Sequence, residues 1–299
     1  MRTTKRFTPT LLARYMKEGR GTGTYQDYIP WHRVGRSDPA SQGRSHLMMW
    51  RGRQRELLSD GEWVAILFST MLPELLDVRE QFKLSLEASA HELASYDVRF
   101  GGYKTYPGTF EIAKQLGIKH PMVHGGGVSD FWTMTTDQLL LLGEAGSDLN
   151  LLAIARKPNS TVLSKRDRQK LLIEKEYWSA RGVSWLLLTP DVFEESVGLT
   201  IRRGAPWALG DPVDPKVIST AVDVVDSALG HTLTYAIRQL GLELGDDDFA
   251  QRAFWQAVWS GTLPLDLRRG WRPHVPVSLL TQAEFASLNP VRSRRSAWN

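Results

Sequence analysis

Between residues 59 and 188 the chain alternates helical and strand-like patterns in an order that strongly limits the fold. The predicted elements are a helix over 59–71, strands over 75–84, 128–134 and 149–157, a helix over 164–180 and a strand over 183–188. A turn at Thr136 and Asp137 is expected between the second and third strands. The order helix, three strands, helix, strand predicts an α/β fold in which flanking helices cover a mixed sheet.

Two of the predicted strands carry residues suited to phosphate chemistry. Asp130 lies on the second strand, after three glycines that let a backbone approach a ligand such as DNA, and Lys157 ends the third. A carboxylate binds a divalent cation, and an ammonium orients water or offsets negative charge beside a phosphate. This arrangement is the core of restriction-endonuclease-like nucleases. Taken alone, Asp130 also fits the start of a strand near a turn, and Lys157 fits a lysine that extends into solvent.

Three further positions bear on this site. The usual nuclease motif has an acid two residues before the lysine, but here that residue is Ala155, whose backbone carbonyl can still bind Mg²⁺. Glu62 is a candidate for the missing carboxylate, although the run from Ser59 to Glu62 also matches a capping box. Glu174 lies among charged residues of the later helix, where a solvated helix face is the default interpretation.

Charge and composition exclude several classes of protein. The 37 basic and 33 acidic residues nearly balance, but basic residues dominate the first fifty positions and the last eight. Basic ends favour a polyanionic partner, and solvated tails are the alternative. The absence of cysteine excludes disulfides, thiolate metal sites and a cysteine nucleophile. The longest apolar run, near residues 63–68, is too short to cross a bilayer, so a cytoplasmic protein without membrane contact is expected.

The character of the sequence changes after residue 190. Helical patterns cover residues 216–229, 232–242 and 246–260, and a hairpin is expected within 263–277. Three helices and a hairpin outline a winged helix, and they also fit another small helical adaptor. The predicted organisation is a basic N-terminal arm and helix over 1–50, a catalytic domain over 51–190 and a helical partner-binding domain over 191–299.

Several blocks of sequence, in order and at similar spacing, resemble one known family. They are Lys17-Glu18-Gly19-Arg20-Gly21, Asp27-Tyr28-Ile29-Pro30-Trp31, Gly43-Arg44-Ser45-His46, Leu57-Leu58-Ser59-Asp60 with Glu62, Asp77-Val78-Arg79-Glu80-Gln81-Phe82, Gly117-Ile118-Lys119-His120-Pro121, Ser129-Asp130-Phe131, Lys157-Pro158, and Tyr177-Trp178 with Trp185. From about residue 16 to 189 the chain resembles TnsA, the endonuclease subunit of heteromeric cut-and-paste transposases. The C-terminal third is similar only in length and helical outline.

The resemblance implies a site and a cofactor. The family's catalytic carboxylates fall on Glu62 and Asp130, its lysine on Lys157, and a further acid on Glu174. The residue two before the lysine is typically glutamine in the family and is Ala155 here. These matches imply a Mg²⁺-dependent nuclease, with Mn²⁺ as an expected substitute, in which Glu62, Asp130 and the Ala155 carbonyl hold the metal.

The resemblance also implies a substrate and partners. The substrate is double-stranded DNA at transposon ends, which the protein nicks on the 5′ side of the element in the bacterial cytoplasm. A TnsB-like transposase subunit cuts and joins the 3′ ends, and a TnsC-like AAA+ ATPase binds the C-terminal domain. Two alternatives remain: a stand-alone restriction-like nuclease, and a non-catalytic DNA-binding scaffold with a decayed site.

Overall fold

The computed structural model describes residues 6–41, 43–102, 104–144, 148–158 and 163–298. The chain divides into two compact units. The first comprises Met1–Trp63, Glu74–Leu187 and Trp298, and the second comprises Val64–Pro73, Leu188–Ala297 and Asn299. Helix α2 (Asp60–Thr70) passes from the first unit into the second.

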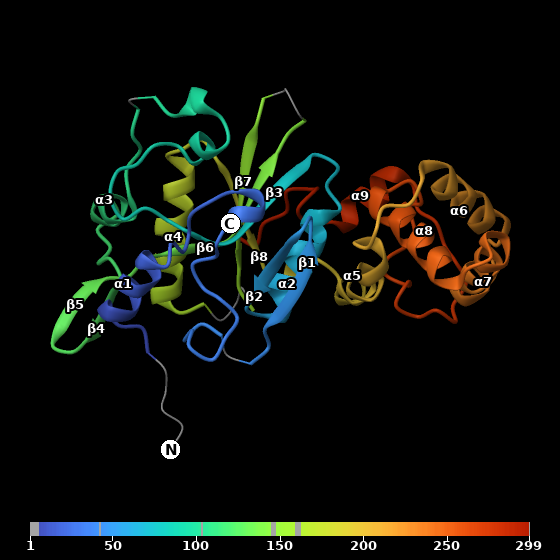
Figure 1. Cartoon of the computed structure of the whole chain (residues 1–299), viewed down its shortest axis with the longest axis horizontal. Helices are drawn as coiled ribbons and strands as arrows, with labels where there is room; N and C mark the ends of the chain where they lie inside the picture. The colour runs from blue at the N-terminus through green and yellow to red at the C-terminus, as the bar shows by residue number, and fades with distance from the viewer. Residues whose placement is uncertain (1–5, 42, 103, 145–147, 159–162, 299) are drawn as a thin grey trace, which may run out of the picture. The chain divides into compact units, whose positions relative to one another are not determined.

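A four-stranded sheet forms the centre of the first unit (Figure 1). Its strands, in spatial order, are β3 (Leu75–Lys83), β6 (Thr135–Leu142), β7 (Asn150–Arg156) and β8 (Ser184–Leu188). The pairs β3–β6 and β6–β7 are antiparallel. Helix α4 (Lys165–Ser179) connects β7 to its neighbour β8, as a crossover connection does. The mixed α/β sheet predicted from the sequence is therefore confirmed.

The prediction that residues 128–134 form the second strand of the central sheet is wrong. Strand β5 (Val128–Phe131) is not part of the central sheet, because it pairs with β4 (Met122–Gly125) in a separate two-stranded sheet. Gly126 and Gly127 connect β4 to β5 with φ values of 61° and 76°, the left-handed conformations that a tight hairpin turn needs. The turn expected at residues 136–137 lies inside β6, which supplies the middle strand instead.

Helix α4 covers the sheet with large side chains. Ile173, Tyr177 and Trp178 are fully buried in a core that includes Leu139 and Ala153 of the sheet. The side chain of Ser164, where the sequence predicts the helix to begin, caps the helix start by accepting a hydrogen bond from the backbone N–H of Asp167. Helix α3 (Thr109–Gln115) contacts α4, and the 3₁₀ segments are Tyr25–Asp27, Glu92–Ser95, Val98–Phe100 and Pro190–Val192.

The N-terminal segment packs onto the first unit. Helix α1 (Pro9–Lys17) buries Leu12 and Tyr15 in a small core with Trp31 and Val123. Strands β1 (His46–Trp50) and β2 (Arg53–Leu57) form an antiparallel hairpin. Several basic residues of this segment are paired within the protein: Arg20 with Asp38, Arg33 with Glu56 and Arg44 with Asp60. Arg2 and Lys5 of the predicted basic arm lie outside the described residues.

The second unit is helical. Its helices are α5 (Glu195–Ala208), α6 (Pro215–Ser227), α7 (Leu233–Leu244), α8 (Asp247–Ser260) and α9 (Gln282–Leu288). The three helices predicted here correspond to α6, α7 and α8. The expected hairpin is wrong, because residues 263–277 contain no strand and only isolated bridges, such as Leu265 to Leu279. In the part of the chain that the structure describes, no helix is long and apolar enough to span a membrane.

Candidate functional site

Strand register brings Asp137 to the end of the central sheet beside two other strands. The β6–β7 pairing ends at Gln138 and Ile154, so Asp137 and Ala155 are the next residues along. On the other side, Glu80 pairs with Gln138 and Phe82 with Thr136, which leaves Gln81 opposite Asp137. Gln81, Asp137 and Ala155 therefore occupy neighbouring positions on β3, β6 and β7.

Glu62 reaches this place from the first turn of α2. One carboxylate oxygen, Oε2, accepts hydrogen bonds from the backbone N–H of Leu58 at 2.9 Å and from Nε2 of Gln81 at 2.9 Å. The other, Oε1, accepts a hydrogen bond from Oγ of Ser59, which in turn accepts one from the backbone N–H of Glu62. Glu62 therefore caps its own helix and also turns its carboxylate toward β3.

The local backbone of Gln81 supports this contact. Gln81 has a φ of 49°, a left-handed backbone conformation that residues other than glycine rarely adopt. Its backbone oxygen accepts a hydrogen bond from the N–H of Trp31, while its side-chain amide binds Glu62. Strained residues persist only where the surroundings hold them, and they cluster at functional sites.

The charge of Asp137 changes the chemistry of Glu62. The pKa of Glu62 is raised from its usual 4.5 to about 7, mainly by burial and secondly by repulsion from Asp137. Hydrogen bonds from Leu58, Ser59 and Gln81 act in the opposite direction. The buried carboxyl of Glu62 and the half-buried carboxyl of Asp137 repel each other, so a cation beside them would be favourable.

Glu174 and Lys157 complete the cluster from the side of α4. Glu174 is buried, and its Oε1 accepts hydrogen bonds from Oγ1 of Thr136 at 2.9 Å and from Nε1 of Trp185 at 3.2 Å. Burial, and then repulsion by Asp137, raise its pKa to about 7. The solvated helix face suggested by the sequence does not hold for Glu174.

Lys157 is the cation of the cluster on this side. Burial opposes its charge, but attraction by Asp137, Glu174 and Glu62 outweighs burial and raises the pKa of Lys157 above its ordinary value. Lys157 is therefore charged, and all three carboxyls act on it. The structure brings Glu62, Lys157 and Glu174 together, as the resemblance implied.

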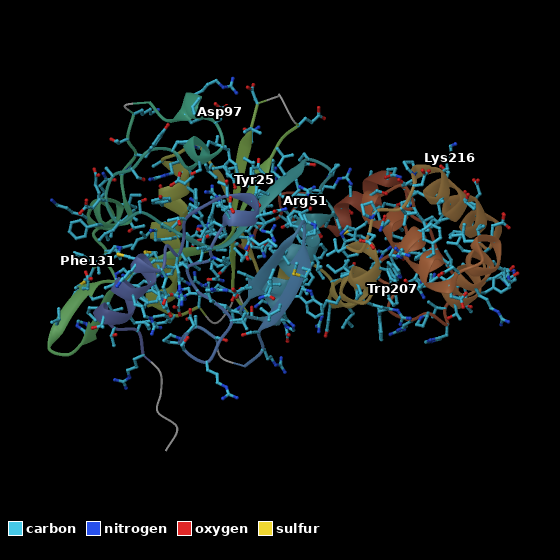
Figure 2. The ribbon with its side chains drawn as sticks, in the orientation of Figure 1. Tyr25, Arg51, Asp97, Phe131, Trp207 and Lys216 are labelled. Atoms are coloured by element: carbon cyan, nitrogen blue, oxygen red, sulfur yellow. The ribbon has the colours of Figure 1, made fainter. Side chains whose placement is uncertain are left out.

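Asp130 does not join them. It is exposed on β5, and its Oδ1 accepts a hydrogen bond from the backbone N–H of its neighbour Phe131. Phe131, the last residue of this strand, is labelled in Figure 2. The acidic groups that act on Lys157 are Asp137, Glu174, Glu62 and Asp167. The expectation that Asp130 shares a site with Glu62 is therefore corrected: Asp137 occupies that place.

Asp137 was missed because its neighbours are polar. A turn was expected at Thr136 and Asp137, yet with Gln138 these residues form the polar end of a strand whose apolar part is residues 139–142. The signal that identifies them is the β-branched pair Thr135-Thr136, followed after Asp137 and Gln138 by four leucines that end just before Gly143. A strand end that carries a site has polar side chains for chemical reasons, and these mask the strand pattern.

The donor set fits a hard divalent cation. Glu62 and Asp137 supply carboxylate oxygens, and the chain at Ala155, which is fully buried, supplies a backbone carbonyl in the neighbouring strand. Mg²⁺ and Mn²⁺ prefer oxygen ligands, and Mg²⁺ keeps several waters. In the described ranges no group of three or more His, Asp or Glu side chains is placed to hold a metal ion, so protein side chains alone do not complete a site. The residues therefore fit an open Mg²⁺ site held by two carboxylates and completed by water.

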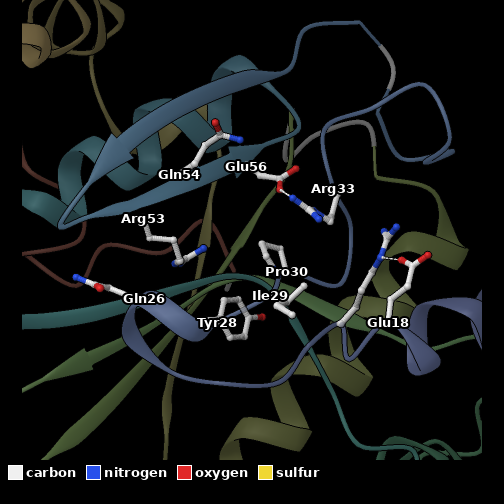
Figure 3. Close-up of a pocket in the computed structure, with 10 residues that line it drawn as sticks. Glu18, Gln26, Tyr28, Ile29, Pro30, Arg33, Arg53, Gln54 and Glu56 are labelled. Carbon is white, nitrogen blue, oxygen red and sulfur yellow. Dashed lines mark hydrogen bonds and ion pairs between the residues drawn. The ribbon is translucent and has the colours of Figure 1, made fainter.

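A nearby cavity of about 480 Å³ is separate from this cluster (Figure 3). Its lining includes Arg20, Arg33, Arg53, Glu18 and Glu56, and none of the cluster residues. Its charges are paired: Arg20 with Glu18, Arg33 with Glu56, and Arg53 with Glu80 at 2.6 Å. This pairing stabilises the hairpin β1–β2 against β3 and leaves no acid–lysine set for hydrolysis.

Comparison with known proteins gives two matches. Residues 73–190 match the family model described as "TnsA-like endonuclease N terminal". The chain is 31% identical over 229 residues to the transposon Tn7 transposition protein TnsA of Escherichia coli, a match that covers 76% of this chain and 71% of that protein. The residues matched by the family model include Asp137, Lys157 and Glu174, and Glu62 lies before them.

Proposed function

The chain belongs to the TnsA family of transposition endonucleases, and from this premise we propose that it makes Mg²⁺-dependent cuts in DNA at the 5′ ends of a transposon. The observation that carries the proposal is the convergence of Glu62, Asp137 and Lys157 at one end of the central sheet. An acid on the middle strand and a lysine ending the next strand suit hydrolysis of a phosphodiester.

Each residue has a distinct role in this proposal. Glu62 and Asp137 hold the cation, and the backbone carbonyl of Ala155 adds a third protein oxygen. When bound, Mg²⁺ supplies electrophilic stabilisation of the charge that develops on the phosphate. Lys157 places a positive charge beside the same phosphate and orients the attacking water. Glu174, fixed by Thr136 and Trp185, positions the Lys157 ammonium.

The reaction is hydrolysis by in-line displacement. Water forms a new bond to phosphorus, the bond from phosphorus to one bridging oxygen breaks, and the leaving oxygen takes up a proton. The fixed charges of the cluster change little during this step, so the site is preorganised for it. A scaffold with a decayed site would have no need to keep the buried carboxyls of Glu62 and Glu174 together with Asp137 and Lys157, because burying charged groups is costly.

Partners complete the proposed activity. The substrate is double-stranded DNA at transposon ends, a TnsB-like subunit acts on the 3′ ends, and a TnsC-like AAA+ ATPase binds the helical second unit. The protein acts in the bacterial cytoplasm. Membership of the TnsA family supports this assembly over a stand-alone nuclease.

The test is strand cleavage in a reconstituted reaction. Plasmid DNA with transposon ends is incubated with this protein, its TnsB-like and TnsC-like partners, ATP and either Mg²⁺ or EDTA. The proposal requires 5′-end breaks with Mg²⁺ that disappear in EDTA and in the Asp137→Asn variant. Breaks of equal yield with Asp137→Asn would overturn it.

A further inference from the structure

Arg156 is held against the first turn of α2 by an unusually close contact. A Cβ atom placed on Gly61 would lie 1.8 Å from both Cζ and Nε of Arg156, and 2.3 Å from its Nη2. The guanidinium therefore lies on the bare Cα of Gly61. The backbone of Gly61 is helical and does not have a positive φ, so any residue could adopt it. Contact with Arg156 is the feature that requires glycine here.

This contact has two local costs. Glycine inside a helix is less stable than alanine, because it loses more backbone freedom. A cation beside the N-terminal turn of a helix also meets the positive end of the helix dipole. Local structure alone therefore favours neither the glycine at position 61 nor the arginine at position 156. This indicates that the contact between them has a functional role.

The surroundings of Arg156 are acidic but do not pair with it directly. Burial lowers the pKa of Arg156, and Asp137, Glu62 and Asp60 partly offset that effect. Among the described residues, no carboxylate lies within ion-pair distance of the guanidinium. Asp60 is bound instead to Nη1 of Arg44 at 3.2 Å and to Nε2 of His46 at 2.7 Å. The Arg156 guanidinium is thus held in place by shape while its charge remains available to a ligand.

Arg156 and Lys157 approach the carboxyl cluster from different sides. Arg156 contacts α2 through Gly61, whereas Lys157, which Asp137 and Glu62 also attract, is in addition attracted by Glu174 and Asp167 of α4. The acidic cluster alone would repel a DNA phosphate. The positive charges of Arg156 and Lys157 beside it would offset this repulsion.

We propose that Arg156 is a substrate-binding residue whose planar guanidinium, held on Gly61, binds a phosphate of the cut strand at or next to the scissile bond. The proposal rests on the nuclease function proposed above and names one more group of the same site. A guanidinium presents a fork of N–H donors that matches two phosphate oxygens, which a lysine ammonium does not. Gly61 serves Arg156, and its role is to leave space for that side chain.

A double-mutant cycle of Arg156 and Gly61 tests the proposal, and DNA binding provides a measurement that is independent of cleavage. Binding of transposon-end DNA is measured in EDTA over a range of salt concentrations for Arg156→Ala, Arg156→Lys, Gly61→Ala and the double variant. Arg156→Ala should weaken binding and reduce the slope of log K against log salt by about 0.9, the value for one phosphate contact. Cleavage with Mg²⁺ should fall about 100-fold, and Arg156→Lys should restore binding more than cleavage.

Gly61→Ala should reproduce the loss in the presence of Arg156 by displacing its side chain. In the Arg156→Ala background the same change should cause no further loss, and the thermal midpoint should stay or rise. The control is Arg99→Ala, which removes an exposed arginine paired with Asp97, labelled in Figure 2. It should leave cleavage unchanged.

Two results would overturn the proposal. One is an unchanged salt slope in Arg156→Ala, and the other is a full additional loss from Gly61→Ala when Arg156 is absent. Failure of the nuclease function itself looks different: the parent protein and Asp137→Asn would then give equal cleavage, while the binding measurements would still decide the role of Arg156.

Discussion

The Oδ2 atom of Asp137 accepts a hydrogen bond of 2.5 Å from the backbone N–H of Arg156. This bond links the carboxylate on β6 to the strand that carries Lys157, at the point where regular pairing of the two strands ends. Asp137 is therefore oriented by the main chain of the neighbouring strand. One of its oxygens is used for this purpose, and the carboxylate still carries the charge that acts on Glu62, Lys157 and Glu174.

The first prediction compares two aspartates. Asp137→Asn should abolish 5′-end cleavage, because an amide is a much weaker ligand for Mg²⁺ than a carboxylate. Asp130→Asn should cut like the parent, because Asp130 is exposed on β5, apart from the cluster. Both variants are assayed in the same reconstituted reaction, after circular dichroism has shown that they fold. Loss of cleavage in Asp130→Asn with full activity in Asp137→Asn would reverse the assignment made here.

These two aspartates also show where sequence reasoning succeeded and failed. Long elements with clear end signals were predictable, such as α4 with its Ser164 cap and β3 over Leu75–Lys83. Asp130 was chosen because it followed three glycines and preceded a lysine strand. However, two of these glycines, Gly126 and Gly127, form the turn of the β4–β5 hairpin. Only the strand pairing in the fold shows that this hairpin is separate from the central sheet.

The roles of Glu62 and Glu174 needed tertiary information. The sequence showed Glu62 as a helix cap, which it is, but only the fold brings Gln81 and Asp137 beside it. Glu174 has charged neighbours along its helix, but its carboxylate is buried and accepts hydrogen bonds from Thr136 of β6 and Trp185 of β8. Arg156 and Gly61 are in contact although about a third of the chain separates them in sequence, so no local sequence pattern predicts this contact.

A second prediction separates the two roles of Glu62. Glu62→Gln should retain the fold, because its amide oxygen can still accept hydrogen bonds from Leu58 and Gln81, while cleavage should be lost. The matched variant is Ser59→Ala, which removes the cap and keeps the carboxylate. It should destabilise the protein by about 1 kcal/mol and cut normally once folded. Thermal unfolding and cleavage of both variants are compared, and normal cleavage by Glu62→Gln would leave Glu62 as a cap alone.

The third prediction concerns pH. The pKa values of Glu62 and Glu174 are about 7 in the folded protein, above their ordinary value of 4.5. Between these values the folded state binds more protons than the unfolded state, so this contribution to stability is complete below about pH 4.5 and is lost as pH rises through 7. In EDTA, the parent should lose on the order of 1–3 kcal/mol more stability than Glu62→Gln over that interval.

Mg²⁺ supplies the complementary measurement. Because the cation requires ionised carboxylates, it should stabilise the parent more at pH 8 than at pH 6. Urea unfolding at several pH values, with EDTA or Mg²⁺, measures both effects. Equal pH profiles for the parent and Glu62→Gln in EDTA would contradict the assigned origin of the shift.

The last prediction concerns Ala155, where glutamine is typical of the family. If the backbone carbonyl there is the metal ligand, Ala155→Gln should change the Mg²⁺ concentration for half-maximal cleavage by no more than a few-fold, because a neutral amide competes weakly with two carboxylates and water. The change should lower stability by about 1–3 kcal/mol, since Ala155 is fully buried and a longer side chain overpacks the core.

Ala155→Leu is the matched control, because it adds comparable bulk without an oxygen. The two variants should then lose similar stability and have similar Mg²⁺ requirements. A marked gain in Mg²⁺ affinity for the glutamine variant alone would show that a side-chain oxygen completes the site and that the backbone-carbonyl assignment is wrong. Comparing the two at equal folded fraction removes the effect of packing, so the Mg²⁺ titration reports only the presence of the extra oxygen.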